Sequence, residues 1–252
     1  MKILAIDTSS KNCSVAITED EEKIIELHSN DEKTHSVKLM PMIDEAFQKS
    51  NLTLNDMDLL ACCLGPGSFT GVRIGISTIK AFTDVTNIPV VGVSSLEGLA
   101  YNAIDNLNSN IMISSTFYCS IIDAKNDNVY CGLYRYYNNC LNQVTDLIAE
   151  DIDTVVSKIN TIMHTFEHQF NQIIFVGDGS TLYQNKIKSE VKYDNIIFVD
   201  ESKNDANSVS IAISAYNKYK NGESGDTHVL SPLYLRKSQA ERALEEKNIK
   251  DI

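Results

Sequence analysis

One order of predicted elements occurs twice along the 252 residues, and this repeat constrains the fold more than any single motif. Each half has strand, strand, strand, helix, strand, helix, strand, helix when apolar periodicity and turn residues are followed along the chain. The predicted strands cover residues 2–6, 14–18, 23–27, 58–64 and 89–93 in the first half, and 116–123, 128–136, 140–148, 173–176 and 196–199 in the second. The predicted helices cover residues 37–47, 69–86, 95–107, 151–169, 181–190 and 206–220.

This order describes a mixed sheet covered by helices and used twice. It matches the ribonuclease-H-like lobe that is duplicated in the superfamily of actin, hexokinase and the sugar kinases (ASKHA), so we expect an α/β protein of two such lobes. The predicted parts are a first lobe over 1–108, a smaller second lobe over 109–204, a helix over 205–222 that bridges the lobes, and a flexible docking tail over 223–252. Fold similarity of this kind says little about activity by itself.

Proteins of that superfamily bind ATP between their lobes, and the resemblance implies where such a site would lie here. The turn after the first strand and the glycine-rich stretch 177–180 would face the phosphates. The residues implied for nucleotide binding are Asp7, Thr8, Ser9, Gly177, Asp178 and Gly179. Asp123, at the end of the second lobe's first strand, either mirrors Asp7 or belongs to a plain strand-end turn. We expect no cofactor to be required, while ATP or ADP can bind in this cleft or in a larger complex.

The charge balance of the chain is acidic, with 34 acidic and 22 basic residues and a formal charge of -12. Such a chain repels a phosphate backbone, so we expect it to contact RNA only through a partner that supplies positive surface. The apolar run at residues 3–6 is too short for a signal peptide or a membrane span. The six cysteines show no C-x-x-C pair and no zinc spacing, so we expect reduced core thiols and a cytoplasmic protein.

The stretch LGPGSFTGVRIG at residues 64–75 stands between a predicted strand and a predicted helix, where glycines either bind a phosphate or turn a tight corner. Glycine accepts backbone angles that other residues avoid, and Ser68 or Thr70 can cap the helix that follows. The stretch lacks the G-K-[ST] signature of a P-loop. We therefore favour a structural corner that lies away from the phosphate-binding turn. Its residues are Gly65, Gly67, Ser68, Thr70 and Arg73.

Two glycines four residues apart in the predicted helix, Gly71 and Gly75, share one face and let another backbone come close. Each costs about 1 kcal/mol relative to alanine, so close packing should compensate for them. The packing partner is either the same lobe's own sheet or a second subunit, and apolar residues nearly all round the helix favour burial on more than one face. With the stretch 40–47, the helix can form half of a helical bundle across a subunit interface. The predicted interface residues are His35, Met40, Ile43, Phe47, Gly71, Val72, Gly75, Ile76 and Ile79.

Three stretches together resemble the bacterial TsaB (YeaZ) family. They are residues 3–9 (ILAIDTS) with 13–16 (CSVA), residues 65–75 (GPGSFTGVRIG) and residues 232–236 (PLYLR). The glycine stretch is the most specific of the three. The resemblance runs from the first strand to the tail, with little contribution from residues 101–170.

The resemblance implies a role in placing threonylcarbamoyl on the adenosine beside the tRNA anticodon. In that family's scheme a TsaD-like subunit carries the metal and the transfer chemistry, a TsaE-like ATPase assists, and tRNA is reached only through the complex. For this chain the resemblance implies a subunit with no catalytic and no metal-binding residues, which holds the TsaD-like subunit in its working state. It also implies a homodimer when the chain is alone, and no membrane contact.

Two enzyme functions are the alternatives. A small ATP-dependent kinase or hydrolase would use Asp7 and residues 177–179, although nothing in the sequence marks a base or a sugar pocket. A metalloprotease would need a metal site, and His164 and His168 have the H-x-x-x-H spacing of one. No third ligand stands out near them in the sequence, so we expect two solvated histidines on an acidic helix and disfavour the metalloprotease.

Overall fold

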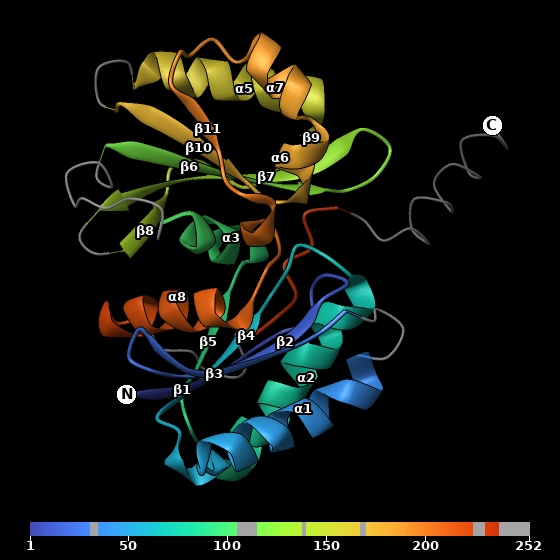
Figure 1. Ribbon diagram of the computed structural model, residues 1–252, viewed down its shortest axis with the longest axis vertical. Helices are drawn as coiled ribbons and strands as arrows, with labels where there is room; N and C mark the ends of the chain where they lie inside the picture. Colours follow the sequence, from blue (N-terminus) through green and yellow to red (C-terminus); the bar gives the residue numbers. More distant parts are fainter. Residues whose placement is uncertain (31–34, 105–114, 138–139, 167–169, 224–229, 237–252) are drawn as a thin grey trace, which may run out of the picture.

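Two mixed sheets, one in each lobe, form the framework of the computed structural model (Figure 1). It describes residues 1–30, 35–104, 115–137, 140–166, 170–223 and 230–236. The first sheet contains β1 (Lys2–Asp7), β2 (Cys13–Glu19), β3 (Glu22–Ser29), β4 (Leu59–Cys63) and β5 (Val90–Val93). The second contains β6 (Thr116–Asp123), β7 (Asn128–Tyr137), β8 (Cys140–Gln143), β9 (Ile148–Asp151), β10 (Gln172–Val176) and β11 (Ile196–Phe198).

Both sheets have the same strand order. In the first the order is β3-β2-β1-β4-β5, and in the second it is β11-β10-β6-β7-β8, with β9 paired to β7. The central strand β1 pairs antiparallel with β2 and parallel with β4. In the same way, β6 pairs antiparallel with β7 and parallel with β10. The duplicated element order predicted from the sequence is therefore confirmed, and the structure adds that the first strand of each half, β1 or β6, lies at the centre of its sheet.

Helices cover both faces of each sheet, which gives the layers seen in Figure 1. α1 (His35–Ser50) and α2 (Phe69–Thr86) lie on the outer face of the first sheet, and α8 (Ser208–Lys220) lies on its inner face. α3 (Ser95–Ile104) covers the inner face of the second sheet, α5 (Ile152–Thr165) and α7 (Gln184–Glu190) cover its outer face, and α6 (Asp178–Leu182) follows the end of β10. α3 and α8 contact each other, so the two lobes share one inner layer.

The parallel strands β4 and β10 are apolar without alternation, apart from Gln172 at the start of β10, because helices bury both of their faces. Every residue of β4 and of β10 is buried. One core lies between the first sheet and the helices α1 and α2, and another lies between the second sheet and α5. Of the helices that the structure describes, none has the length and apolarity that crossing a membrane requires.

Side chains at the helix starts explain where α2 and α5 begin. The Ser68 hydroxyl accepts a hydrogen bond from the N–H of Gly71, and the Asp151 carboxylate accepts one from the N–H of Thr154. Each side chain satisfies a backbone donor that the first helical turn leaves free. Of the two residues that the sequence offers as the cap of α2, the structure uses Ser68 and leaves Thr70 exposed in the first turn.

Two predicted elements are divided in the structure. The predicted strand 140–148 is two strands, β8 and β9, which pair with different parts of β7. Asp146 lies between them, and aspartate is disfavoured in strands. The predicted helix 181–190 is α6 and α7, and α6 begins at Asp178, inside the stretch predicted to be a glycine-rich loop. The predicted ends of the helices 95–107 and 151–169 run beyond the described residues.

α2 lies close against the end of β1 because the inner face of the helix carries glycines. A methyl group on Gly71 would overlap the carbonyl oxygen of Thr8, and one on Gly75 would lie 2.6 Å from Thr8 Oγ1. Thr8 Oγ1 donates a hydrogen bond of 2.7 Å to the carbonyl of Gly71. This corrects the expectation that the glycine face contacts another subunit. The face packs on its own lobe, since only hydrogen at these two positions lets helix and strand approach so closely.

Most other residues of the predicted interface also lie inside the first lobe, which corrects their assignment. Those with at most 4% of their surface exposed are His35, Ile43, Val72, Ile76 and Ile79. Phe47 packs against the same core, whereas Met40 is half exposed. The inner positions of α1 and α2 are therefore used within the lobe, and only their outer positions are open to a partner.

Replacing Gly71 by alanine tests the contact between α2 and β1. Alanine normally stabilises a helix by about 1 kcal/mol relative to glycine. Here the added methyl group would press on the Thr8 carbonyl, so we expect Gly71→Ala to lower the free energy of unfolding by about 1–3 kcal/mol. The control is Ser77→Ala at an exposed position of the same helix, which we expect to change little. Denaturant unfolding measures both, and a Gly71→Ala protein as stable as the wild type would contradict the contact.

Candidate functional site

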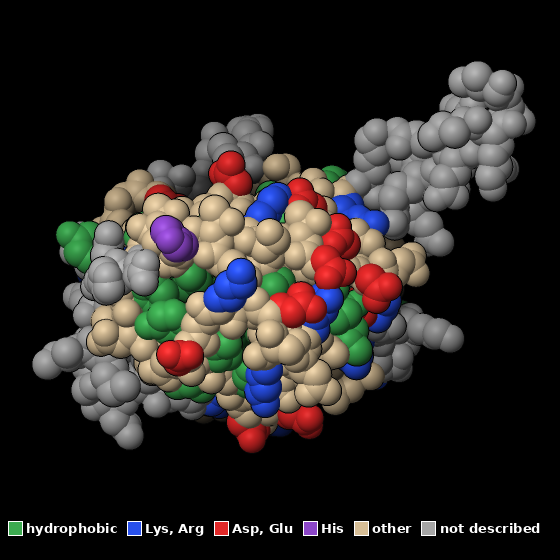
Figure 2. All heavy atoms as spheres, turned by 90° about the horizontal axis from the view of Figure 1, so that it is seen from above, with side chains coloured by type: hydrophobic (Ala, Val, Ile, Leu, Met, Phe, Trp, Pro, Cys, Tyr) green, Lys and Arg blue, Asp and Glu red, His purple; other side chains and the backbone are tan. Residues whose placement is uncertain are grey.

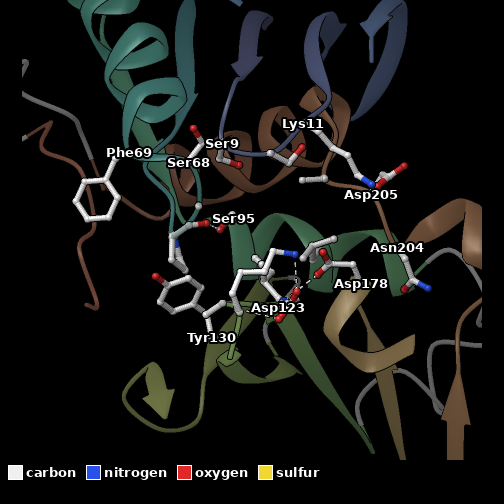
Figure 3. A pocket seen from close by; sticks show the side chains of 18 residues that line it. Ser9, Lys11, Ser68, Phe69, Ser95, Asp123, Tyr130, Asp178, Asn204 and Asp205 are labelled. Carbon is white, nitrogen blue, oxygen red and sulfur yellow. Dashed lines mark hydrogen bonds and ion pairs between the residues drawn. The ribbon is translucent and has the colours of Figure 1, made fainter. Parts of the chain in front are cut away.

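A cavity of about 470 Å³ lies between the two lobes (Figure 3). Residues from both lobes and from the inner layer form its walls. These are residues 9–11 and 66–69, Ser95, Leu99, residues 122–125, Tyr130, Asp178 and residues 204–206. A space of this size suits a small-molecule ligand.

Two loops far apart in the sequence form the first lobe's wall. The N–H of Ser68 donates to the carbonyl of Ser9 at 2.6 Å, and a Cβ on Gly67 would overlap that carbonyl. Gly65, with φ +88°, turns the chain out of β4 and into this contact. The glycine loop therefore lies directly beside the turn after β1, which corrects the expectation that it lies away from that turn. The cause is the parallel pairing of β1 with β4, which brings the ends of both strands to one edge of the sheet.

Asp7 lies behind this wall and does not line the cavity, contrary to the prediction that it faces a nucleotide. It has 1% of its surface exposed, and its Oδ1 accepts a hydrogen bond of 2.7 Å from the N–H of Ser9. Its Oδ2 is buried without a hydrogen-bond partner among the residues that the structure describes. Burial raises the pKa of this carboxyl, although the hydrogen bonds from Ser9 oppose the change. In this position Asp7 shapes the turn after β1.

Two aspartates form the acidic part of the second lobe's wall. The N–H of Asp123 donates to Asp178 Oδ1 at 3.0 Å, and Asp123 Oδ2 lies 2.7 Å from Lys125 Nζ. Burial raises the pKa of Asp178, and the nearby charge of Asp123 acts in the same direction. Asp123 has the place in the second sheet that Asp7 has in the first, at the end of the central strand. Unlike Asp7, it lines the cavity.

Gly177 and Gly179 are used for packing and do not line the cavity. Gly177 has φ +101°, and its N–H donates to Asn204 Oδ1 at 2.7 Å. A Cβ on Gly179 would lie 2.7 Å from Ile121 Cγ2, so α6 can begin close to β6. Of the six residues predicted to bind nucleotide, the structure places Ser9 and Asp178 in the walls. It places Asp7, Thr8, Gly177 and Gly179 outside them.

Several residues of the walls carry no motif that the sequence alone would single out. Figure 3 shows Lys11 and Asp205 on one side of the cavity and Phe69 and Tyr130 on the other. The Asn/Asp-rich stretch 126–128 is a turn signal that could have drawn attention to Lys125, and the structure has a tight turn there, with positive φ at residues 125–127. The walls thus combine carboxylates, ammonium groups and aromatic rings, so the cavity can bind a polar ligand that contains a flat ring.

Within the described ranges, no group of three histidine, cysteine or carboxylate side chains is arranged to hold a metal ion. His164 is exposed on α5, and His168 lies outside those ranges. All six cysteines are free, and five of them are buried. Burial raises the pKa of Cys13 to about 11 and that of Cys62 to about 12, so both remain thiols at neutral pH.

Exposed apolar side chains lie on the outer helices of the first lobe. Val37 and Met40 of α1 are 69% and 50% exposed, and Val85 of α2 is 76% exposed. The two helices contact each other and lie side by side in Figure 1.

Both helices begin near the turn after β1, where His35 Nε2 lies 2.9 Å from the carbonyl oxygen of Ser10 and the N–H of Ser68 donates to that of Ser9. Val85, near the end of α2, therefore lies at the opposite end of the helix pair from Val37 and Met40. We call the outward side of the two helices, which carries these three separate side chains, the α1–α2 outer face. Val37 and Met40 are three residues apart on α1 and so lie on one side of it, which makes this end of the outer face a candidate protein-binding surface.

The opposite end of the molecule has a different character. Figure 2 shows the face above α5 and α7, where acidic and basic side chains are interspersed. A mixed surface of this kind gives no extended positive field for an RNA backbone.

Comparison with known proteins relates this architecture to a family. A family model described as tRNA N6-adenosine threonylcarbamoyltransferase (TsaD) matches residues 27–244. The tRNA threonylcarbamoyladenosine biosynthesis protein TsaB of Bacillus subtilis is 30% identical over 243 residues, which are 96% of this chain and 96% of that protein. This chain belongs to the TsaB (YeaZ) family.

Solved structures agree with this assignment at the level of the fold. YeaZ from Pseudomonas aeruginosa has a TM-score of 0.74 and 22% identity, covering 93% of this chain and 99% of that one. An inorganic polyphosphate/ATP-glucomannokinase from Arthrobacter has a TM-score of 0.54 and 9% identity, covering 87% and 99%. The predicted fold of two ribonuclease-H-like α/β lobes is therefore confirmed.

The buried carboxyl of Asp7 predicts a pH dependence of stability. Because burial raises its pKa, the folded protein keeps the proton over a pH range in which the unfolded chain has lost it. The stability that Asp7 contributes is therefore complete below the ordinary aspartate pKa and falls as the pH rises through the raised value. We expect Asp7→Asn to remove this decline, so that the variant gains stability relative to the wild type between about pH 4 and pH 7. Denaturant unfolding at both pH values measures this difference. Asp84→Asn, at an exposed position, is the control, and an unchanged difference between wild type and Asp7→Asn would contradict the prediction.

Proposed function

We propose that this chain is a non-catalytic subunit in the biosynthesis of tRNA threonylcarbamoyladenosine, where it binds a TsaD-like subunit and favours that subunit's working state. A TsaE-like ATPase acts with the complex, tRNA is reached through it, and the chain pairs with itself in the cytoplasm when alone. The descriptions of the similar proteins support the pathway, since they name tRNA threonylcarbamoyladenosine biosynthesis and the threonylcarbamoyltransferase.

The α1–α2 outer face is the observation that carries this proposal. Its three side chains are each at least half exposed, although the helices that hold them are otherwise packed against the first lobe. Covering one such side chain completely contributes about 1.5–3 kcal/mol to binding. A protein partner that covers this face therefore gains much of its affinity here.

The support beneath this face is rigid. Leu39, Ile43 and Ala46 of α1 are buried, and the glycines of α2 fix that helix on the end of β1. A surface that does not have to rearrange loses little free energy on binding. Such a surface shifts a partner between two conformations when it binds one of them more tightly, which is the mechanism we propose for the TsaD-like subunit.

The inter-lobe cavity favours a second candidate function, an ATP-dependent kinase or hydrolase. The turn 9–11 offers hydroxyls and one ammonium group, and Asp123 and Asp178 offer carboxylates, which are the ligands that Mg²⁺ prefers. We propose that ATP or ADP binds here, in the chain alone or in the complex. For the subunit role we expect binding without turnover.

A charge in the α1–α2 outer face tests the subunit role. We expect Val37→Asp to weaken binding to a TsaD-like subunit about 10- to 100-fold, since it replaces an apolar contact by a carboxylate that must lose its water. Threonylcarbamoyl transfer to tRNA, reconstituted with TsaD-like and TsaE-like subunits, should fall with it. Leu182→Asp is the matched control, because Leu182 is 61% exposed on the second lobe. Calorimetry measures the affinity. If Val37→Asp binds the TsaD-like subunit with the affinity of the wild type, the proposed interface is wrong.

A charge in the cavity tests nucleotide binding. We expect Ser10→Glu to weaken ATP binding about tenfold, because the added carboxylate repels the phosphates. Ser77→Glu, on an exposed position of α2 away from the cavity, should bind ATP as the wild type does. Calorimetry gives the affinity, and phosphate release measured in the same samples separates the two functions. Steady release by the wild type would favour the kinase or hydrolase.

A further inference from the structure

We propose that residues 230–236 form a latch that ties the two lobes together beside the inter-lobe cavity. These residues include the PLYLR stretch of the tail, for which the proposed function has no use. The inference does not depend on what the cavity binds.

The backbone of the latch is anchored in the first lobe. Leu230 is 5% exposed and belongs to the core beneath α1 and α2. The N–H of Leu233 donates a hydrogen bond of 2.7 Å to the carbonyl of Leu64, the residue that follows β4 and precedes the glycine loop. The latch therefore begins beside the loop that forms the first lobe's wall.

An aromatic contact then joins the latch to that wall. The ring of Tyr234 stacks on the ring of Phe69 with the centroids 4.6 Å apart and the planes 10° apart. Arg73 Nε donates to Tyr234 Oη at 2.6 Å, which holds the tyrosine from the side of α2. Phe69 lines the cavity, so Tyr234 supports one of its walls from behind.

The end of the latch reaches the second lobe. Arg236 Nη1 donates a hydrogen bond of 3.1 Å to the carbonyl of Ala124, and Leu235 packs against the core between α3 and the second sheet. Ala124 stands between Asp123 and Lys125, and all three residues line the cavity. Within seven residues, the latch thus contacts both walls of the cavity.

The strength of these contacts suits a device that opens. Tyr234 is 44% exposed, and the side-chain contacts beyond Leu233 are the ring stack, the two hydrogen bonds, the Arg73 guanidinium 5.6 Å from the centre of the Tyr234 ring, and the packing of Leu235. Both hydrogen bonds come from charged guanidinium groups, but one is exposed and the other only partly buried, so water competes for these donors and the latch can detach while the lobes stay folded. When the latch detaches, both walls lose a contact at the same time. A change that loosens the latch at one lobe therefore also loosens the wall in the other lobe.

Hydrogen exchange on the full-length chain, read by mass spectrometry, tests this coupling. The reporter of the second wall is the N–H of Ala124, which donates to the carbonyl of Asn128 at 2.9 Å, and that of the first wall is the N–H of Ser68. We expect Tyr234→Ala to speed exchange in the peptide 120–130 about tenfold, although Tyr234 contacts the other lobe. We expect Arg236→Ala to speed exchange in the peptide 64–70 by a similar factor.

Matched variants separate a latch from a loss of stability. Tyr234→Phe keeps the ring stack and should speed exchange less than Tyr234→Ala. Tyr137→Ala removes another exposed tyrosine, 62% exposed at the far end of β7, and should change neither peptide. Faster exchange limited to the two walls supports the latch. Unchanged exchange in the wall that a variant does not touch, or a uniform rise across the chain, overturns it.

Discussion

The close approach of α2 to the end of β1 is the contact on which the rest of the first lobe depends. Gly71 and Gly75 leave room for Thr8, and the hydrogen bond from Thr8 to the Gly71 carbonyl fixes the depth of the helix. Once the helix is fixed, the loop before it must lie on Ser9, which builds one wall of the cavity. The same contact orients the outer side of α2 toward solvent. This wall of the cavity and the orientation of α2 are thus two consequences of one packing constraint.

In the second lobe, glycines likewise allow the chain to lie close to the end of the central strand. The chain after β4 reads GPGS from residue 65, and the chain after β10 reads GDGS from residue 177, where α6 begins at the second residue. In both lobes the strand before these residues lies parallel to the central strand. A Cβ on Gly67 would overlap the carbonyl of Ser9, and a Cβ on Gly177 would overlap that of Ile121, each near the end of a central strand. The duplication therefore has a trace in the sequence, visible only when the two sheets are aligned strand by strand.

We expect binding to occur at side chains that are not already engaged in packing within a lobe. The inner sides of α1 and α2 are fully engaged, so a partner can use only their outer side chains. Between the lobes, the carboxylates of Asp123 and Asp178 remain in a wall while Asp7 is withdrawn from it. The latch contacts both walls through Tyr234 and Arg236, which links the shape of the cavity to the tail.

The sequence by itself determined the order of the elements, apart from the two that the structure divides, and a helix cap at Ser68 or Thr70, because these depend on residues within one or two turns of each other. The tertiary structure decided what the glycines of α2 face and which aspartate lines the cavity. Both follow from the parallel pairing that sets Ile3 opposite Leu59 and brings distant strand ends together. The periodicity of a helix shows that it has a close-packed face, but the surface that meets this face depends on strands more than fifty residues away.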